Sequence, residues 1–275
     1  PPESHTVIGQ AALEARKHVL IEKPLALQTA DCDRLIETRK TAAGKVVVGF
    51  NLRWHRLVQE ARHFINTGAL GPIKAIRSAY THNRQGDATP SWKRSLRSGG
   101  GVTFHEAIHH FDLWHFLLGS EVRQVMALHQ SSEWFEDETS VLSARLSNGV
   151  LASLVSTYQT SPNSEIEIFG QAGRLVISFY RFDGLAFYPA SVYPGDVQDR
   201  LKKGLQTLRQ LPAFLPVLRR GGDFAESFYR LWHHFLSCIR DDRDSECSLE
   251  DGKKAVQVAL AAEESFLSEK HVHLS

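Results

Sequence analysis

The first fifty residues alternate between amphipathic and fully apolar segments. Residues 6–17 carry apolar side chains at helical spacing, and the apolar run 18–21 that follows ends at the tripeptide 22–24. A second round predicts a helix over 29–41 and, after a turn, an apolar strand over 46–50. Strands that are apolar throughout are typical of a parallel sheet covered by helices on both faces. We therefore predict an α/β arrangement for this part of the chain.

From residue 73 onward the pattern changes to alternating or β-branched segments, which are typical of strands that we expect to be antiparallel. The best local sign of this is the pair Asn148-Gly149, which we expect to supply the positive φ angles of a tight hairpin turn. The predicted strands are 73–82, 122–129, 139–146, 150–158, 165–169 and 174–179.

Helical patterns lie between these strands and after them. Residues 102–118 are interpreted as one helix, and 223–240 and 249–268 as two more. Residues 197–220 are basic and apolar by turns. We interpret them as a solvated helix with a proline-bounded insertion, with a membrane-surface or partner-binding role as the alternative.

The charge balance bears on the choice of partner. The 275 residues carry 32 basic and 31 acidic side chains, for a net charge of +1. This balance removes any global electrostatic reason to expect nucleic acid or an anionic membrane as partner. Nor does any apolar run reach the roughly 18 to 20 residues of a membrane span. We expect a small-molecule ligand.

The cysteines indicate the redox setting. Only Cys32, Cys238 and Cys247 occur, an odd number at wide spacing. Such spacing provides neither a disulfide framework nor a paired metal knuckle. A reduced, cytoplasmic setting is therefore expected.

Two features could carry chemistry. Lys23 follows a buried strand directly, at the carboxyl edge of a parallel sheet, where such sheets bind ligands. The second feature is the glycine run 99–101, which would let backbone approach a ligand, followed by a helix on which His105, His109 and Asp112 share one face. A histidine at that place could accept a hydroxyl proton while the carbon loses hydride. In isolation, a lysine such as Lys23 is more often exposed and salt-bridged, and the histidine is as easily a core residue bonded to a neighbouring acid.

The same helix also offers a metal-based alternative. Residues 105–109 read HEAIH, the H-E-x-x-H pattern of zinc peptidases, and His115 falls where a third ligand would lie. Against this, Asp112 occupies the position of a glycine in the longer zinc motif, and Met126 comes too soon for its methionine turn. We therefore expect no metal site.

Several of these pieces together resemble the family of glucose-fructose oxidoreductase, inositol dehydrogenase and MocA. The resemblance covers nearly the whole chain. Its most specific part is Glu-Lys-Pro after a strand combined with the glycine–histidine helix. The matching segments are 2–5, 18–24, 49–53, 68–73, 99–101 with His109 and Asp112, 169–173, and 250–252.

The resemblance implies a division of the chain into two domains. Residues 1–50 would be the C-terminal remnant of a Rossmann domain that binds NAD or NADP. Residues 51–275 would form a domain with an open, mainly antiparallel sheet flanked by helices, often used for homo-oligomerisation. The implied activity is hydride transfer between the nicotinamide and a hydroxyl-bearing carbon of a sugar, polyol or related compound.

The resemblance also assigns roles to residues. His109 would be the acid/base, and Lys23 would touch both the cofactor and the reacting hydroxyl. The other implied cofactor contacts are Pro2, His5, Glu22 and Pro24, with Arg53 and Trp92 as weaker candidates that line the nicotinamide or substrate cleft.

The chain departs from the family pattern in two ways. Many relatives have aspartate four residues before the catalytic histidine, where this chain has His105 with Glu106 beside it. The partner of His109 is therefore left open between these residues. The chain also lacks the G-x-G-x-x-G turn and the acidic residue that reads the adenosine ribose. We expect a fragment of a longer protein or a shortened gene model, with a nonenzymatic binding or assembly module as the alternative.

Overall fold

The computed structural model describes residues 1–84, 86–193, 201, 204–205, 208, 212, 214, 217–218 and 220–274. The basic and apolar segment 197–220, for which we weighed a solvated helix against a membrane or partner role, thus lies largely outside the described residues.

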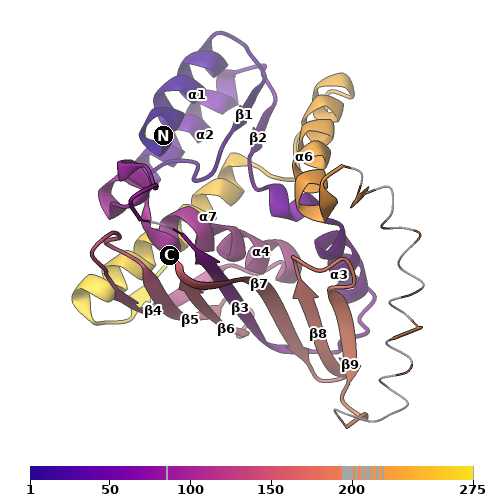
Figure 1. Cartoon of the computed structure of the whole chain (residues 1–275). Coiled ribbons are helices and arrows are strands. Elements are labelled where there is room, and N and C mark those ends of the chain that lie inside the picture. Colours follow the sequence, from indigo (N-terminus) through magenta and orange to yellow (C-terminus); the bar gives the residue numbers. More distant parts are fainter. Residues whose placement is uncertain are drawn as a thin grey trace.

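The N-terminal part is a small α/β unit, as predicted (Figure 1). Its two strands pair in parallel, with Val19 opposite Val46. A Cβ atom at Gly9 would come within 2.9 Å of Ile21, so the glycine lets the first helix pack closely on the first strand. The elements are η1 (Pro2–Ser4), α1 (His5–Glu14), β1 (Val19–Ile21), α2 (Thr29–Thr41) and β2 (Val46–Val48).

The second part is built on an eight-stranded sheet in the order β10-β4-β5-β6-β3-β7-β8-β9. Neighbouring strands are antiparallel except β3 and β6, which run parallel. Our expectation of antiparallel strands is wrong for this pair. The two strands are separated in the chain by a helix and two further strands, and that long crossover makes a parallel pairing possible. The strands are β3 (Ile73–Asn83), β4 (Val122–Gln130), β5 (Thr139–Leu146), β6 (Leu151–Thr157), β7 (Gln159–Gly170), β8 (Gly173–Ser178), β9 (Leu185–Pro189) and β10 (Val272–His273).

The turn between β5 and β6 differs from the tight hairpin that Asn148-Gly149 predicts. Only Gly149 has a positive φ, of 85°. Its N–H donates to the carbonyl oxygen of Leu146 at 2.9 Å, so the loop contains three residues. A turn followed by one left-handed glycine is the usual three-residue hairpin, and it satisfies the strand twist without a second positive φ.

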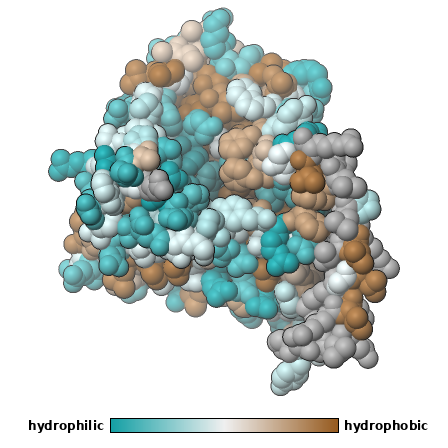
Figure 2. Space-filling view, in the orientation of Figure 1, coloured by the Kyte–Doolittle hydropathy of each residue, from teal (hydrophilic) through white to brown (hydrophobic). Residues whose placement is uncertain are grey.

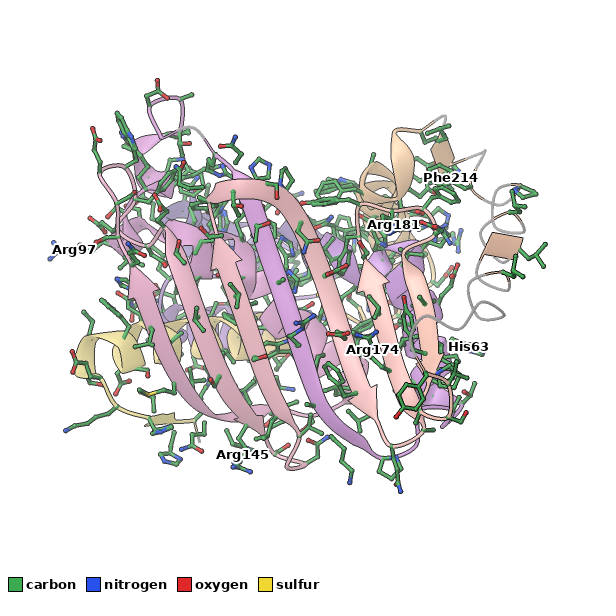
Figure 3. The ribbon with its side chains drawn as sticks, turned by 60° about the horizontal axis from the view of Figure 1, so that its bottom comes forward. His63, Arg97, Arg145, Arg174, Arg181 and Phe214 are labelled. Carbon is green, nitrogen blue, oxygen red and sulfur yellow. The ribbon has the colours of Figure 1, made fainter. Side chains whose placement is uncertain are left out.

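Helices cover one face of the large sheet, and its other face is open (Figures 1 and 3). The core lies between them; there, Trp114 Nε1 donates to the Ser78 hydroxyl at 2.8 Å, which joins a helix to β3. The helix α7 begins with a capping box formed by Ser248 and Asp251. The helical elements of this part are η2 (Asn51–Trp54), α3 (Arg56–Asn66), η3 (Ser91–Lys93), η4 (Leu96–Ser98), η5 (Thr103–Ala107), α4 (Ile108–Leu118), α6 (Gly222–Arg240) and α7 (Leu249–Ser268).

The open face of the sheet carries a row of apolar side chains. Leu128, Val141 and Val155 lie opposite one another on β4, β5 and β6, and are 64%, 45% and 46% exposed. We call these three residues the apolar row. The face of the molecule seen in Figure 2 is different, because hydrophilic residues cover much of its left side. Across the described parts of the chain, no helix is both long and apolar enough to traverse a bilayer.

Candidate active site

The glycine run forms a tight turn before α4. Gly99 and Gly101 have φ angles of 74° and 78°. A Cβ atom at Gly100 would lie 2.5 Å from the backbone carbonyl carbon of Lys93. We expected the glycines to let a ligand approach the backbone, but here they let the chain pack against itself. The glycine run thus anchors the start of the helix to the segment that carries Lys93.

The predicted helix over 102–118 forms without a break but is not α-helical throughout. Residues Thr103–Ala107 form a π-helical turn, η5, and the α-helix α4 begins at Ile108. The sequence pattern did not indicate this π turn. Because a π turn contains extra backbone, the simple four-residue spacing no longer determines which side chains share a face.

Asp137 holds the beginning of this turn in place. Its Oδ2 atom accepts the Thr103 N–H at 2.8 Å, and its backbone oxygen accepts the Val102 N–H at 2.9 Å. The side chain is buried, and burial raises the pKa of Asp137 to about 6. Sequence reasoning missed this residue, because it lies more than thirty positions from the turn and belongs to no local motif.

Lys23 reaches this turn from the end of β1. Its Nζ atom donates to the backbone carbonyl of His105, although the two residues are 82 positions apart. The side chain is half-buried, and burial lowers the pKa of Lys23 below its usual value. The structure thus brings Lys23 and the π turn together at the carboxyl edge of the parallel strands.

Two side chains of the π turn, those of His105 and Glu106, contact residues outside the turn. The Glu106 carboxylate accepts from the Arg84 guanidinium at 2.5 Å, and His105 Nε2 lies 3.6 Å from the same carboxylate oxygen. The Trp92 ring meets the His105 ring edge-on, at 5.5 Å between centroids. Sequence reasoning missed Arg84, which follows the end of β3 without a recognisable motif.

His109 lies one turn further along. It is half-buried, and its ring meets that of Phe50 edge-on at 5.9 Å. Its Nδ1 atom is buried and has no hydrogen-bond partner among the described residues. Burial, and then the charge of Lys23, hold the pKa of His109 well below its usual value of 6.5. The imidazole is therefore neutral near neutral pH.

Asp112 does not join His109, although helical spacing suggested a shared face. Asp112 is buried, and its Oδ2 atom accepts from Arg53 Nε at 2.8 Å. Arg53 also donates to Asp251 on α7 at 3.1 Å and to the backbone carbonyl of Glu246 at 2.6 Å. With a guanidinium only 3% exposed, Arg53 ties α4 to α7 and has little surface left for a cofactor.

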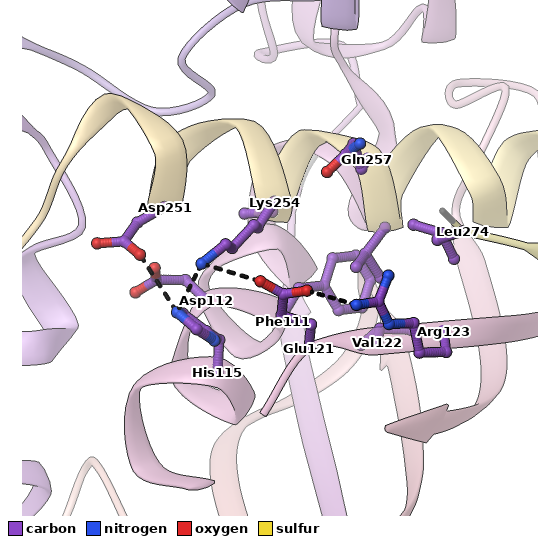
Figure 4. A pocket seen from close by; sticks show the side chains of 12 residues that line it. Phe111, Asp112, His115, Glu121, Val122, Arg123, Asp251, Lys254, Gln257 and Leu274 are labelled. Atoms are coloured by element: carbon purple, nitrogen blue, oxygen red, sulfur yellow. Dashed lines mark hydrogen bonds and ion pairs between the residues drawn. The ribbon is translucent and has the colours of Figure 1, made fainter. Parts of the chain in front are cut away.

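Behind α4 lies a small charged cavity of about 30 Å³ (Figure 4). His115 and Lys254 line it, with His115 Nε2 3.3 Å from Asp251 on α7. This volume holds about one water molecule and no sugar. His115, which the zinc alternative placed as a third ligand, is thus bonded to α7. Within the described ranges, no group of three His, Cys, Asp or Glu side chains could hold a metal ion.

The remaining predicted cofactor residues gather near Lys23. The His5 Nδ1–H donates to the Pro24 carbonyl oxygen at 2.8 Å, which joins α1 to the end of β1. Pro2 is buried, and a Cβ atom at Gly99 would lie 3.5 Å from it, so η1 and the glycine run meet here. Glu22 is exposed at the same strand end. The arrangement fits the nicotinamide end of a dinucleotide, where such sheets bind their ligands.

The fold and this edge of the sheet together define a dinucleotide-dependent oxidoreductase. The family model described as "Oxidoreductase family, NAD-binding Rossmann fold" matches residues 1–50, and that of the GFO/IDH/MocA C-terminal domain matches residues 58–176. The chain therefore belongs to the GFO/IDH/MocA family of oxidoreductases, as the resemblance in its sequence indicated.

Individual relatives agree with this placement. The chain is 27% identical to myo-inositol 2-dehydrogenase of Thermotoga maritima, an alignment that covers 98% of this chain and 77% of the relative. It is 26% identical to levoglucosan dehydrogenase of Pseudarthrobacter phenanthrenivorans, over 99% and 77% of the two chains. Its fold resembles that of a levoglucosan dehydrogenase solved with NADH and levoglucosan, with a TM-score of 0.81 at 23% identity over 100% of this chain and 78% of the other.

Proposed function

We propose that this oxidoreductase transfers hydride between NAD or NADP and a hydroxyl-bearing carbon of a sugar, polyol or related compound. The observation that carries the proposal is the meeting of Lys23 with the His105 carbonyl, next to His109, at the carboxyl edge of β1. The relatives named as inositol and levoglucosan dehydrogenases support the substrate class. We assign residues 1–50 to the cofactor domain and residues 51–275 to the substrate and assembly domain.

The chain's own residues would handle the proton and the charge. His109 is neutral because of its burial, so it can accept the hydroxyl proton as the alcohol is oxidised. Nδ1 is enclosed, which leaves Nε2 to meet the substrate. The Lys23 ammonium would stabilise the negative charge that develops on the hydroxyl oxygen. When bound, the nicotinamide cofactor would supply the acceptor for the hydride that leaves the carbon.

The cofactor contacts are proposed from the residues at the end of β1. Pro2, His5, Glu22, Lys23 and Pro24 would hold the nicotinamide ribose, and Trp92, against His105, would line the substrate side of the cleft. We do not include Arg53, whose guanidinium is bonded to Asp112, Asp251 and a backbone carbonyl.

The open face of the large sheet supports homo-oligomerisation. The apolar row is solvent-exposed across three neighbouring strands, and a self-complementary sheet face is a common way to bury such residues. Cys32, Cys238 and Cys247 are free and buried, which is consistent with the reducing cytoplasm that we propose as its compartment.

Removing the His109 imidazole tests the catalytic assignment. We expect His109→Ala to lower kcat for oxidation of an inositol or anhydrosugar substrate by about 100-fold or more, because proton transfer loses its base. Initial rates of NADH formation over a panel of polyols and sugars would measure this, with the equilibrium affinity for NADH as the control for folding. A kcat within a few-fold of the parent would remove His109 from the mechanism.

A further inference from the structure

Three cations converge on the π turn. Lys23 donates to the His105 carbonyl, Arg84 binds Glu106, and Lys93 lies in the short helix η3, which packs against the glycine run. Burial and the charges of these three residues lower the pKa of His105 to about 2. Burial also lowers the pKa of Lys23, the charges of Glu106 and Glu22 raise it, and those of Lys93 and Arg84 lower it. The three cations and these two acids therefore lie close together around the π turn.

Two acids lie near these three cations. Glu106 accepts from Arg84 at 2.5 Å, and Glu22 is exposed at the strand end. Lys93 makes no ion pair with a carboxylate in the described part of the chain, and its Nζ atom lies 5.2 Å from the centroid of the adjacent Trp92 ring. Three cations beside two carboxylates leave this cluster with a net positive charge, so the cluster is suited to an anion.

The hydrogen-bond donors of this cluster are also incompletely used. Arg84 Nε is buried and has no partner among the described residues. Buried donors are nearly always satisfied in folded proteins, and an unsatisfied one beside a candidate active site is a place for an acceptor atom of a ligand.

The position of Lys93 is determined by the backbone around it. Gly100 packs directly on the Lys93 carbonyl group, where a Cβ atom would come within 2.5 Å. The preceding Trp92 ring lies against His105 at 5.5 Å. Lys93 is therefore held beside the candidate active site by the same glycine run that leads to His109.

We infer that the substrate carries an anionic group, a carboxylate or a phosphate on a sugar or polyol, and that Lys93 with Arg84 recognises it. The inference rests on the proposed function, because it names the substrate class of that same site. The anion would sit near Lys93 and supply the acceptor oxygens that Arg84 Nε lacks, while Lys23 and His109 act on a hydroxyl of the same molecule.

Binding measured without turnover tests this directly. Calorimetric titrations of the full chain with saturating NADH would compare glucuronate, galacturonate, gluconate and glucose 6-phosphate with the neutral parent sugars. We expect the anionic members to bind about tenfold or more tightly, as one charge-assisted contact allows. Glucose 6-phosphate binding better than the acids would identify a phosphate as the anion, and the reverse would identify a carboxylate.

Substitutions assign the effect to one residue. Lys93→Gln should reduce the preference for the anion about tenfold, and Lys93→Arg should retain most of it. The control is Lys74→Gln, which removes the same charge from an exposed position near the start of β3 and should keep the preference. Equal binding of acids and neutral sugars, or a preference that survives Lys93→Gln, would overturn the inference.

These titrations, together with the assay of NADH formation described for the proposed function, separate this inference from the proposed function. A chain that oxidises neutral polyols and shows no anion preference keeps the proposed function and loses the inference. A chain that binds the acids through Lys93 but forms no NADH from any member of the panel keeps the anion site and loses the oxidoreductase assignment.

Discussion

At the scale of single residues, the site is dominated by burial. Burial removes Lys23 and His109 from water and lowers the pKa of both side chains. The two lowered pKa values have different consequences for the enzyme. A lower pKa keeps His109 neutral and ready as a base. The lowered pKa of Lys23 brings the loss of its charge closer to physiological pH.

These two shifts predict the pH dependence of alcohol oxidation. The rate should rise as pH increases through the lowered pKa of His109, below 6.5, because the base must be neutral. It should fall again as Lys23 loses its proton at a pH below its usual 10.5. In Lys23→Arg the basic fall should move beyond the measurable range, because arginine stays protonated, and turnover should drop because a planar guanidinium replaces a compact ammonium.

Profiles of kcat/KM against pH for both enzymes would check this. His18→Gln is a suitable control, because His18 lies at the opposite end of β1 from Lys23, where its ring accepts from the Lys45 N–H at 3.0 Å. If kcat/KM of Lys23→Arg falls at the same basic pH as that of the parent enzyme, a group other than Lys23 causes the fall.

At the scale of elements, the π turn η5 depends on Asp137, which lies in the loop between β4 and β5. Asp137 accepts the Thr103 N–H just where the turn begins, and Gly101 lets the carboxylate approach, since a Cβ there would lie 2.7 Å from Asp137 Cβ. The positions of His105 and Glu106 thus depend on the buried Asp137 carboxylate, which is distant from both residues in the sequence. We regard Asp137 as a positioning residue.

Asp137→Asn should change how stability depends on pH. The folded chain holds the Asp137 proton up to about pH 6, whereas an unfolded chain releases it near 3.8, so the parent protein loses stability as pH rises between these values. The amide does not titrate. The stability of Asp137→Asn relative to the parent should therefore increase across this range, by up to about 3 kcal/mol.

Urea unfolding at a series of pH values would measure the difference. Asp87→Asn, a substitution of an exposed aspartate, provides the control and should show no such trend. A constant difference between Asp137→Asn and the parent would mean that the carboxylate is charged throughout, and that Gly101 and Thr103 compensate its burial.

At the scale of the whole molecule, the large sheet has two different faces. Helices cover one face, and the other is open (Figure 3). The exposed side chains of the apolar row lie on the open face. An exposed row that crosses three strands is more than the scattered apolar residues that any surface carries. Association of two copies through this face would bury it.

Val155→Glu should shift the chain toward the monomer, because it introduces a charge into the apolar row. Sedimentation velocity over a range of concentrations would measure the shift. Leu267→Glu is the matched control, since Leu267 is 71% exposed on α7 and should not affect association. If Val155→Glu sediments like the parent at every concentration, the sheet face is not the interface.

Periodicity alone predicted the longer elements. The helices 29–41 and 249–268 and the strand 139–146 match α2, α7 and β5 residue for residue, because each buries one side at a regular spacing. Sequence analysis missed α3 and the strands β9 and β10. β10 has two residues and forms only by pairing with the edge of β4, so no local sequence pattern could predict it.

The sequence by itself determined the class of fold, the family and the candidate pair Lys23 and His109, because these depend on local periodicity and on motifs short enough to read. Only the tertiary structure decided what surrounds that pair. Arg84 follows β3, Lys93 lies in η3 and Asp137 lies in the loop before β5. These distant segments meet only when burial of the core brings them together. For the same reason the structure assigns Asp112 to Arg53, although helical spacing had placed it beside His109.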